Sequence, residues 1–228
     1  MIFYKLFYRI ITYIKMQSST IPSILFILDE SGSMKSMGSE PIDGMRNFYK
    51  TQQETGKEFL STFITFSNSV RFRHKNTKGS EIIIKDDDFL PNGMTALYDA
   101  IGTGIDYQKN ISTNNVICVI LTDGQENSSK IYNLTEIKKL ISDMEKEYNW
   151  QFIYLGANQD SFSVGNGLGI QKGVAQNYNY TENGLRDIMR STSLMVSSSI
   201  CCQNERSDEP PSPLGDESMF DSVIIKRT

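Results

Sequence analysis

Three short stretches of the sequence carry hydroxyl and carboxylate side chains in spacings that suit a metal ion. In DESGSM, Asp29 is followed at alternate positions by Ser31 and Ser33. Thr95 stands two residues after a glycine in PNGMT, and Asp123 precedes a glycine in LTDGQ. Oxygen ligands of this kind suit a hard cation such as Mg²⁺, or Mn²⁺, in near-octahedral geometry. Each stretch alone is more typical of a turn or a helix cap, so the surrounding elements decide whether they can meet.

Two of the stretches directly follow apolar runs. SILFIL, residues 23–28, leads into Asp29, and NNVICVIL, residues 114–121, leads toward Asp123. Short continuous apolar runs are typical of strands that are buried on both faces of a parallel sheet. Because ligands bind outside the carboxyl ends of such strands, the two aspartates are expected to be neighbours in space.

The rest of the chain alternates between helix and strand patterns. Apolar residues at helical spacing predict helices within residues 42–54, 94–110, 132–148 and 181–198. Further strands are expected within 58–73, as a strand and its hairpin partner, within 81–93, and within 150–160. VGNGLGI, residues 164–170, is interpreted as a flexible loop. This order predicts an α/β protein with right-handed crossovers and a mainly parallel sheet covered on both faces.

The three stretches, in this order and at strand ends or a helix entry, resemble the metal-ion-dependent adhesion site of von Willebrand factor A (vWA) domains. The resemblance runs from about Ser23 to about Ser199 and includes the order of the elements. It implies a Rossmann-like three-layer α/β fold, with a mainly parallel central sheet, one antiparallel edge hairpin and helices on both faces. The expected organisation is an N-terminal extension over residues 1–20, a vWA domain over 21–200 and a disordered tail over 201–228.

The same resemblance implies one bound divalent metal ion. In that family the two serines and the threonine commonly bind the metal directly, while the aspartates act directly or through water. Carried over to this sequence, these roles fall on Ser31, Ser33 and Thr95, and on Asp29 and Asp123. One coordination position is then left open for a carboxylate from a partner. Other acidic residues are interpreted as solvated loop residues outside the site: Glu126, Asp99 and the run Asp86, Asp87 and Asp88.

The first fifteen residues, MIFYKLFYRIITYIK, are apolar but interrupted by Lys5 and Arg9. The stretch lacks the length of a transmembrane helix and the uninterrupted apolar region of a signal peptide. Three readings stay open: translation that starts at Met16, an extra packed helix or strand, and a basic amphipathic membrane anchor. A cytoplasmic location is expected, with secretion and membrane attachment as the less favoured alternatives.

Composition and single residues argue against several classes of function. The net charge is −4 and no cluster of Lys and Arg stands out, so nucleic acid is not expected as a partner. His74 is the only histidine and lies among basic residues, which argues against a Ser-His-Asp triad. Ser31 occupies the position where a haloacid-dehalogenase-type phosphotransferase needs its second aspartate. No Walker-type loop is present, and the protein is expected not to be an enzyme.

Three functions are weighed on the same site. The first is a Mg²⁺-dependent protein-interaction module whose partner presents an Asp or Glu carboxylate to the metal. The second is an extracellular or surface adhesin, in which four sequons would be glycosylation acceptors: Asn110, Asn127, Asn133 and Asn179. The third and least favoured is a metal-dependent phosphoester enzyme, in which the open position holds water or phosphate.

Overall fold

The computed structural model describes residues 21–111, 114–157, 161–171 and 173–208. Its strands are β1 (Ser23–Asp29), β2 (Leu60–Phe66), β3 (Val70–Lys78), β4 (Val116–Thr122), β5 (Gln151–Ala157) and β6 (Val174–Tyr178). Its α-helices are α2 (Glu40–Glu54), α3 (Leu97–Ile111), α4 (Leu134–Glu147), α5 (Ser161–Gly167) and α6 (Glu182–Asp208). Short 3₁₀ helices are η1 (Gly32–Met37), η2 (Gly79–Glu81) and η3 (Asp86–Asp88).

All six strands belong to one sheet, in the order β3-β2-β1-β4-β5-β6. The β2–β3 pair is antiparallel and the other pairs are parallel, which confirms the predicted parallel sheet with an antiparallel edge hairpin. The strand order reverses between β1 and β4, and ligands bind at such switch points in open α/β sheets. Leu28 pairs with Leu121, so the two central strands end at the same level.

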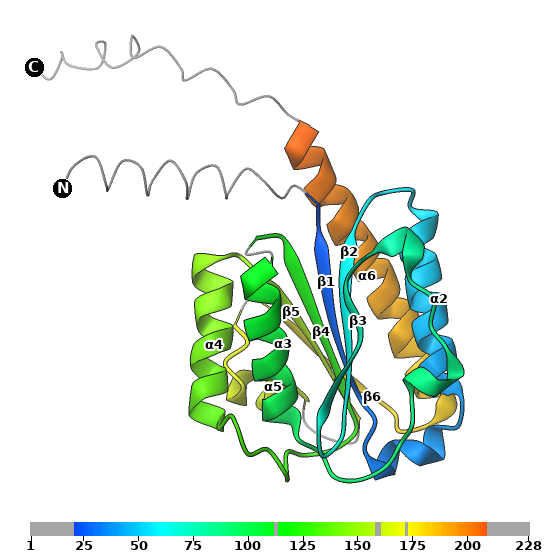
Figure 1. Cartoon of the computed structure of the whole chain (residues 1–228), viewed down its shortest axis with the longest axis vertical. Coiled ribbons are helices and arrows are strands. Elements are labelled where there is room, and N and C mark those ends of the chain that lie inside the picture. The colour runs from blue at the N-terminus through cyan, green and yellow to red at the C-terminus, as the bar shows by residue number, and fades with distance from the viewer. Residues whose placement is uncertain (1–20, 112–113, 158–160, 172, 209–228) are drawn as a thin grey trace, which may run out of the picture.

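Helices cover both faces of the sheet and complete the predicted three layers (Figure 1). α2 and α6 pack side by side on one face, and α3, α4 and α5 lie on the other. Each face has its own apolar core, one built around Phe26, Phe48 and Phe63 and the other around Ile120, Ile141 and Phe152. Because β1 and β4 are buried along their whole length, the strands that end at the candidate site are firmly held.

Local sequence explains where the helices begin. Asn133 caps α4: its side chain accepts hydrogen bonds from the backbone of Thr135 and Glu136, while the Glu136 side chain accepts from the backbone N–H of Asn133. α2 carries Pro41 in its first turn, where a missing N–H costs no hydrogen bond. It therefore begins at Glu40, slightly before the predicted residue 42.

Two segments differ from the sequence-based expectations, and in the first of them side chains take over backbone hydrogen bonds. Residues 82–84 form no strand, although Ile82 and Ile84 are buried and Ile83 is exposed. Gln53 and Arg46 of α2 donate to the carbonyls of Ile82 and Ile84, so this extended segment needs no strand partner. The second segment is residues 164–170, for which the sequence predicts a flexible loop. Residues 164–167 belong to helix α5, so only the rest of this stretch is a loop.

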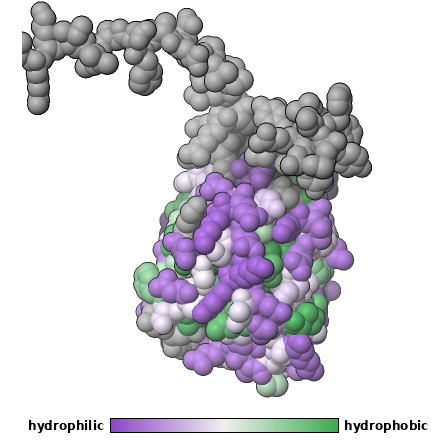
Figure 2. Space-filling model, turned by 90° about the vertical axis from the view of Figure 1, so that its left-hand side faces the viewer, coloured by the Kyte–Doolittle hydropathy of each residue, from purple (hydrophilic) through white to green (hydrophobic). Residues whose placement is uncertain are grey.

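At its C-terminal side the described structure ends in helix α6. Helix α6 continues to Asp208, eight residues beyond the domain end expected at residue 200. The expected N-terminal extension over residues 1–20 and residues 209–228 of the expected tail lie outside the described residues. In the part of the chain that is described, no helix has the length and apolar character needed to cross a membrane. The side of the molecule that carries α4 is mostly hydrophilic (Figure 2).

Candidate metal centre

Asp29, the last residue of β1, is fully buried at the carboxyl edge of the sheet. Its Oδ1 accepts a hydrogen bond from the backbone N–H of Ser31 at 2.7 Å, and its Oδ2 accepts from the Thr122 hydroxyl at 2.6 Å. Burial raises the pKa of this carboxyl to about 6, although both hydrogen bonds favour the charged form. Within the described residues Asp29 forms no ion pair. A buried carboxylate without a cation is costly, and metal coordination is one common solution.

The hydroxyls of the first loop extend outward from Asp29. Ser31 is buried, and its Oγ lies 3.1 Å from the Oγ of exposed Ser33. The Ser33 hydroxyl donates to Oδ1 of Asp123 at 2.9 Å. Four of the five predicted residues, Asp29, Ser31, Ser33 and Asp123, therefore form a connected set that reaches from the buried end of β1 to the surface.

Thr95 enters the same site beside Gly124. The threonine is 4% exposed, and a Cβ built on Gly124 would lie 3.0 Å from Thr95 Oγ1 and 3.8 Å from Asp29 Oδ2. The absence of a side chain at Gly124 thus lets the β4 loop approach both oxygens closely. The structure accordingly brings all five predicted residues together at the ends of β1 and β4.

The spacing of these oxygens fits a small hard cation. Neighbouring ligands of an octahedral Mg²⁺ ion, bound at about 2.0–2.1 Å, are separated by about 2.8–3.0 Å. The Ser33–Asp123 and Ser31–Ser33 oxygens, at 2.9 and 3.1 Å, are close to that separation. No group of three His, Cys, Asp or Glu side chains in the described structure could hold a metal ion. The candidate set differs from such groups because most of its ligands are hydroxyls.

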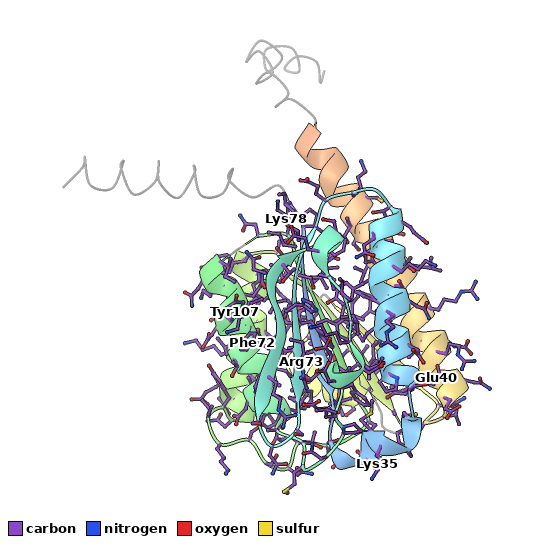
Figure 3. All side chains as sticks on the ribbon, turned by 45° about the vertical axis from the view of Figure 1, so that its right-hand side comes forward. Lys35, Glu40, Phe72, Arg73, Lys78 and Tyr107 are labelled. Atoms are coloured by element: carbon purple, nitrogen blue, oxygen red, sulfur yellow. The ribbon has the colours of Figure 1, made fainter. Side chains whose placement is uncertain are left out.

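Glu30, the residue between Asp29 and Ser31, is a positioning residue that sequence reasoning missed. It is fully buried, and its carboxylate accepts from Arg71 at 2.6 Å and Arg73 at 3.1 Å, both on β3. The same carboxylate accepts from the backbone N–H of Leu90, and the Glu30 carbonyl accepts from Asn92. Figure 3 shows Arg73 on β3. Glu30 therefore ties the first metal loop to the segment that leads to Thr95.

The Thr95 loop depends on a glycine with a left-handed backbone. Gly93 has φ +77°, and a Cβ there would lie 2.1 Å from Oδ1 of Asn68. That oxygen instead accepts from the backbone N–H of Met94 at 2.5 Å. The carbonyl of Gly93 accepts from Gly32 at 3.0 Å, which joins the first and second loops directly.

A second missed residue, Asn127, fixes the backbone of Thr95. Its Oδ1 accepts from the Thr95 N–H at 2.8 Å, and its own N–H donates to the Thr95 carbonyl at 3.0 Å. Thr122 instead orients the side chain of Asp29, because its hydroxyl donates to Oδ2 of that carboxylate. Asn127 has no sequence signature of its own, because Asn is common in loops.

Asp99 and Glu126 are not the solvated loop residues that the sequence suggested. Asp99 is 7% exposed and accepts three backbone hydrogen bonds, from Lys130, Ile131 and Tyr132. Glu126 accepts from the N–H of Tyr98 in the first turn of α3 and from Ser128 and Ser129. Together they hold the β4–α4 loop against α3, so the interpretation is corrected: both carboxylates are structural.

Two tyrosines, Tyr178 and Tyr180, lie near the site. The Tyr180 hydroxyl contacts the Ser33 carbonyl and the Ser36 hydroxyl, which holds η1 in place. The Tyr178 hydroxyl is buried and has no hydrogen-bond partner among the described residues. Burial raises the pKa of Tyr178, and the negative charge of Asp123 and Asp29 adds to the effect. The site therefore concentrates negative charge in a partly dry environment.

Comparisons with solved structures identify the fold. The vWA protein from Catenulispora acidiphila superposes with a TM-score of 0.53 at 14% identity, over 79% of this chain and 43% of the other. The pilus adhesin SpaC from Lactobacillus rhamnosus GG gives a TM-score of 0.62 at 13% identity, over 80% of this chain and 31% of the adhesin. The fold is that of a vWA domain. The chain spans less than half the length of each of these solved chains.

A third similar solved structure is described with a bound metal. Proximal thread matrix protein 1 from the mussel byssus, described with a zinc-occupied MIDAS motif, superposes with a TM-score of 0.50 at 16% identity. The match covers 78% of this chain and 48% of that protein. No protein-family model matches the sequence, and no curated protein matches it. These similarities establish the vWA fold of this chain. Its ligand and partner are inferred from the chemistry of the site.

Proposed function

We propose that this vWA-fold chain is a Mg²⁺-dependent, or Mn²⁺-dependent, protein-interaction module. The observation that carries the proposal is the buried Asp29 carboxylate, which has no cationic partner among the described residues and faces a set of hydroxyls. A divalent ion would neutralise this charge and use oxygens that already lie near octahedral spacing. The mussel protein, which is similar in fold, is described with a zinc-occupied MIDAS motif, and this supports the proposal of a bound metal.

The five candidate residues fall into two groups, hydroxyl ligands and carboxylates. Ser31, Ser33 and Thr95 would hold the ion through their hydroxyls, with Asp29 and Asp123 supplying negative charge directly or through water. When bound, the ion supplies a positive charge that attracts a carboxylate from a partner. Because Ser33 and Asp123 form the exposed side of the set, an Asp or Glu of a partner protein would enter there.

We further propose that the chain is not an enzyme and acts in the cytoplasm. His74 lies on edge strand β3, where its Nε2 is 3.2 Å from the Ile83 carbonyl, so no histidine base stands at the site in the described structure. The runner-up function is a surface adhesin that uses the same metal centre, a role that the similarity in fold to a pilus adhesin favours. Cell fractionation and mass spectrometry of the sequons would separate the two: export with glycans supports the adhesin.

Metal titration of the purified chain tests the proposal. Isothermal titration calorimetry with MgCl₂ and MnCl₂ should show one site, which weakens at least tenfold in Asp123→Ala. The matched control is Asp87→Ala, since Asp87 is an exposed aspartate in η3 whose carboxylate is not a candidate ligand. Equal affinity in Asp123→Ala and wild type, or no binding of either metal, would overturn the proposal.

A selection experiment tests the partner carboxylate. A random peptide library displayed on phage is bound to the immobilised chain in Mg²⁺ and eluted with EDTA. The eluted peptides should be enriched in Asp or Glu, and their binding should disappear in Asp123→Ala. Peptides that stay bound in EDTA, or that lack an acidic residue, would argue against a metal-bridged carboxylate.

A further inference from the structure

A pocket of about 270 Å³ lies next to the candidate metal centre, at the same edge of the sheet. Its walls are largely apolar and include Leu97, Leu134, Val164 and Leu168. The volume is slightly below the range of about 300–1,000 Å³ that is common for small-molecule sites. The pocket is therefore suited to one or two side chains of a larger partner.

The pocket and the metal centre share walls. Gly124, whose lack of a side chain lets the loop after β4 approach Thr95 Oγ1, also lines the pocket. Leu97, another wall residue, is two positions after Thr95 at the start of α3. Glu126 at the rim is held by backbone hydrogen bonds from Tyr98, Ser128 and Ser129. Because fixed segments form the shared wall, a group bound to the metal would stand beside the pocket opening.

Several exposed apolar side chains lie in the loops and helix starts that carry the metal centre or the pocket. Met94, just before Thr95, is 48% exposed, and Ile131 in the β4–α4 loop is 70% exposed. Phe162, in the first turn of α5, is 62% exposed, and Leu134 of the pocket wall is 36% exposed. Apolar anchors around a central site, with polar groups at the rim, are typical of protein interfaces.

We propose that this pocket receives an apolar side chain of the same partner whose carboxylate reaches the metal. The proposal rests on the function proposed above and adds the chemistry of the partner: an Asp or Glu with a large apolar residue a few positions away. A protein or peptide fits better than a small carboxylate, because exposed apolar residues that do not line the pocket, Met94, Ile131 and Phe162, offer further contacts on segments of the site and the pocket.

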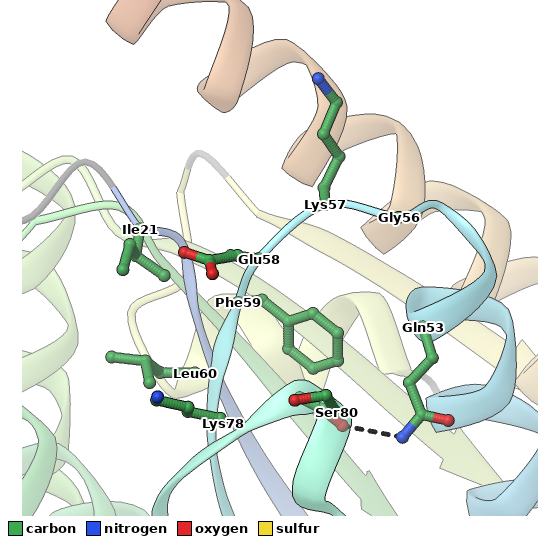
Figure 4. A pocket seen from close by; sticks show the side chains of 10 residues that line it. Ile21, Gln53, Gly56, Lys57, Glu58, Phe59, Leu60, Lys78 and Ser80 are labelled. Atoms are coloured by element: carbon green, nitrogen blue, oxygen red, sulfur yellow. Dashed lines mark hydrogen bonds between the residues drawn. The ribbon is translucent and has the colours of Figure 1, made fainter.

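Another pocket, of about 280 Å³, lies at the opposite edge of the sheet and does not compete for this role. Phe59, Leu60 and Lys78 are among its lining residues, and Gln53 donates to the Gly79 carbonyl nearby (Figure 4). Leu60 and Phe66 are the two ends of β2, whose seven residues span about 20 Å. The two pockets are therefore too far apart to hold neighbouring side chains of one short peptide.

The phage selection described above also tests this inference, with Leu134→Gln as the variant. Leu134 is partly exposed at the start of α4 and is not a candidate metal ligand, so Mg²⁺ affinity by calorimetry should stay at the wild-type value. The matched control is Leu194→Gln, because Leu194 is 56% exposed on α6, which packs on the other face of the sheet.

Peptides selected on the wild type should combine an acidic residue with an apolar residue at a fixed spacing. Their affinity should fall about tenfold in Leu134→Gln, equivalent to about 1.4 kcal/mol, and stay unchanged in Leu194→Gln. Acidic, EDTA-sensitive peptides without an apolar preference would overturn this inference and leave the metal-dependent function standing. Failure of Mg²⁺ to bind the wild type would instead overturn the function on which the inference rests.

Discussion

The Ser33 hydroxyl donates a hydrogen bond of 2.9 Å to the carboxylate of Asp123, although 90 residues separate the two in sequence. Ser33 lies in η1 after β1, and Asp123 directly follows β4, so the contact crosses the point where the strand order reverses. It joins two of the three loops of the candidate metal centre on their exposed side. The pair is therefore the natural place to test whether these loops act as one site.

Replacing Ser33 with alanine should weaken Mg²⁺ binding about tenfold, as loss of one hydroxyl ligand removes one of several contacts. Stability should change by less than about 0.5 kcal/mol, because the side chain is exposed. Calorimetry and urea unfolding measure the two quantities. Ser80→Ala, at an exposed serine in another 3₁₀ helix, is the control and should leave both unchanged. Equal Mg²⁺ affinity in Ser33→Ala would remove Ser33 from the ligand set.

In the absence of metal, the chain should become more stable as pH falls from 7 to 5. The pKa of Asp29 is raised by burial to about 6, above its ordinary value of 3.8, so the folded state binds the proton more tightly than the unfolded state. The stabilising effect is fully present below pH 3.8 and is lost as pH rises through 6. Between pH 7 and 5 this group contributes about 1 kcal/mol.

Urea unfolding in EDTA at both pH values measures this effect, and Asp29→Asn is the matched variant. The amide does not titrate, so the variant should lose about 1 kcal/mol of the difference in unfolding free energy between the two pH values. If the unfolding free energy changes equally with pH in both proteins, Asp29 does not contribute to the pH dependence of stability. In the presence of Mg²⁺ the wild type should bind the ion more weakly at pH 5, because protons compete for the carboxylate.

The centre of this fold is readable from the sequence because it is built from continuous apolar runs. SILFIL and VICVIL admit few alternatives to buried parallel strands, and their pairing brings Asp29 and Asp123 to one edge. Helix α4 is equally clear, since it has a capping residue and a regular apolar stripe. All five predicted site residues lie at or next to strand ends and helix starts. Sequence patterns mark these positions well, so the meeting of these residues was predictable.

The edges of the fold and the supports of the site depend on contacts that no local pattern encodes. β6 reads VAQNY, a short and partly polar run that is a strand only because β5 lies beside it. Glu30 looks like a spacer within DESGSM, and its role emerges only when β3 brings two arginines to it. Asn127 likewise supports Thr95 across 32 residues of sequence.

Gly93→Ala should damage the metal centre without touching a ligand. The new Cβ would meet Asn68 Oδ1 at 2.1 Å, and the left-handed backbone with φ +77° costs about 1–2 kcal/mol for a non-glycine residue. The loop that carries Thr95 would have to shift, so we expect lower stability and Mg²⁺ binding weakened at least tenfold. Gly167→Ala is the control, because a Cβ there meets no atom within 4 Å. Wild-type affinity in Gly93→Ala would show that this loop tolerates displacement.

Glu30→Gln should be among the most damaging of the conservative changes near the site. The carboxylate is fully buried and paired with Arg71 and Arg73, whose side chains are 40% and 15% exposed. Removing its charge leaves Arg73 largely buried without an anion, and loss of one partner from a buried pair costs about 3–5 kcal/mol. Arg71→Gln should cost about 1 kcal/mol or less, because Arg71 is more exposed and Glu30 keeps Arg73.

Urea unfolding measures both costs, and Mg²⁺ calorimetry on the folded variants separates stability from positioning. Because Glu30 also accepts from Leu90, Glu30→Gln should weaken Mg²⁺ binding as well, whereas Arg71→Gln should leave it near the wild-type value. If Glu30→Gln unfolds at lower urea but binds Mg²⁺ normally, the ion pairs of Glu30 with Arg71 and Arg73 stabilise the β2–β3 hairpin and do not position the metal loops. If it loses both, the residue between Asp29 and Ser31 sets the geometry of the metal loops through β3.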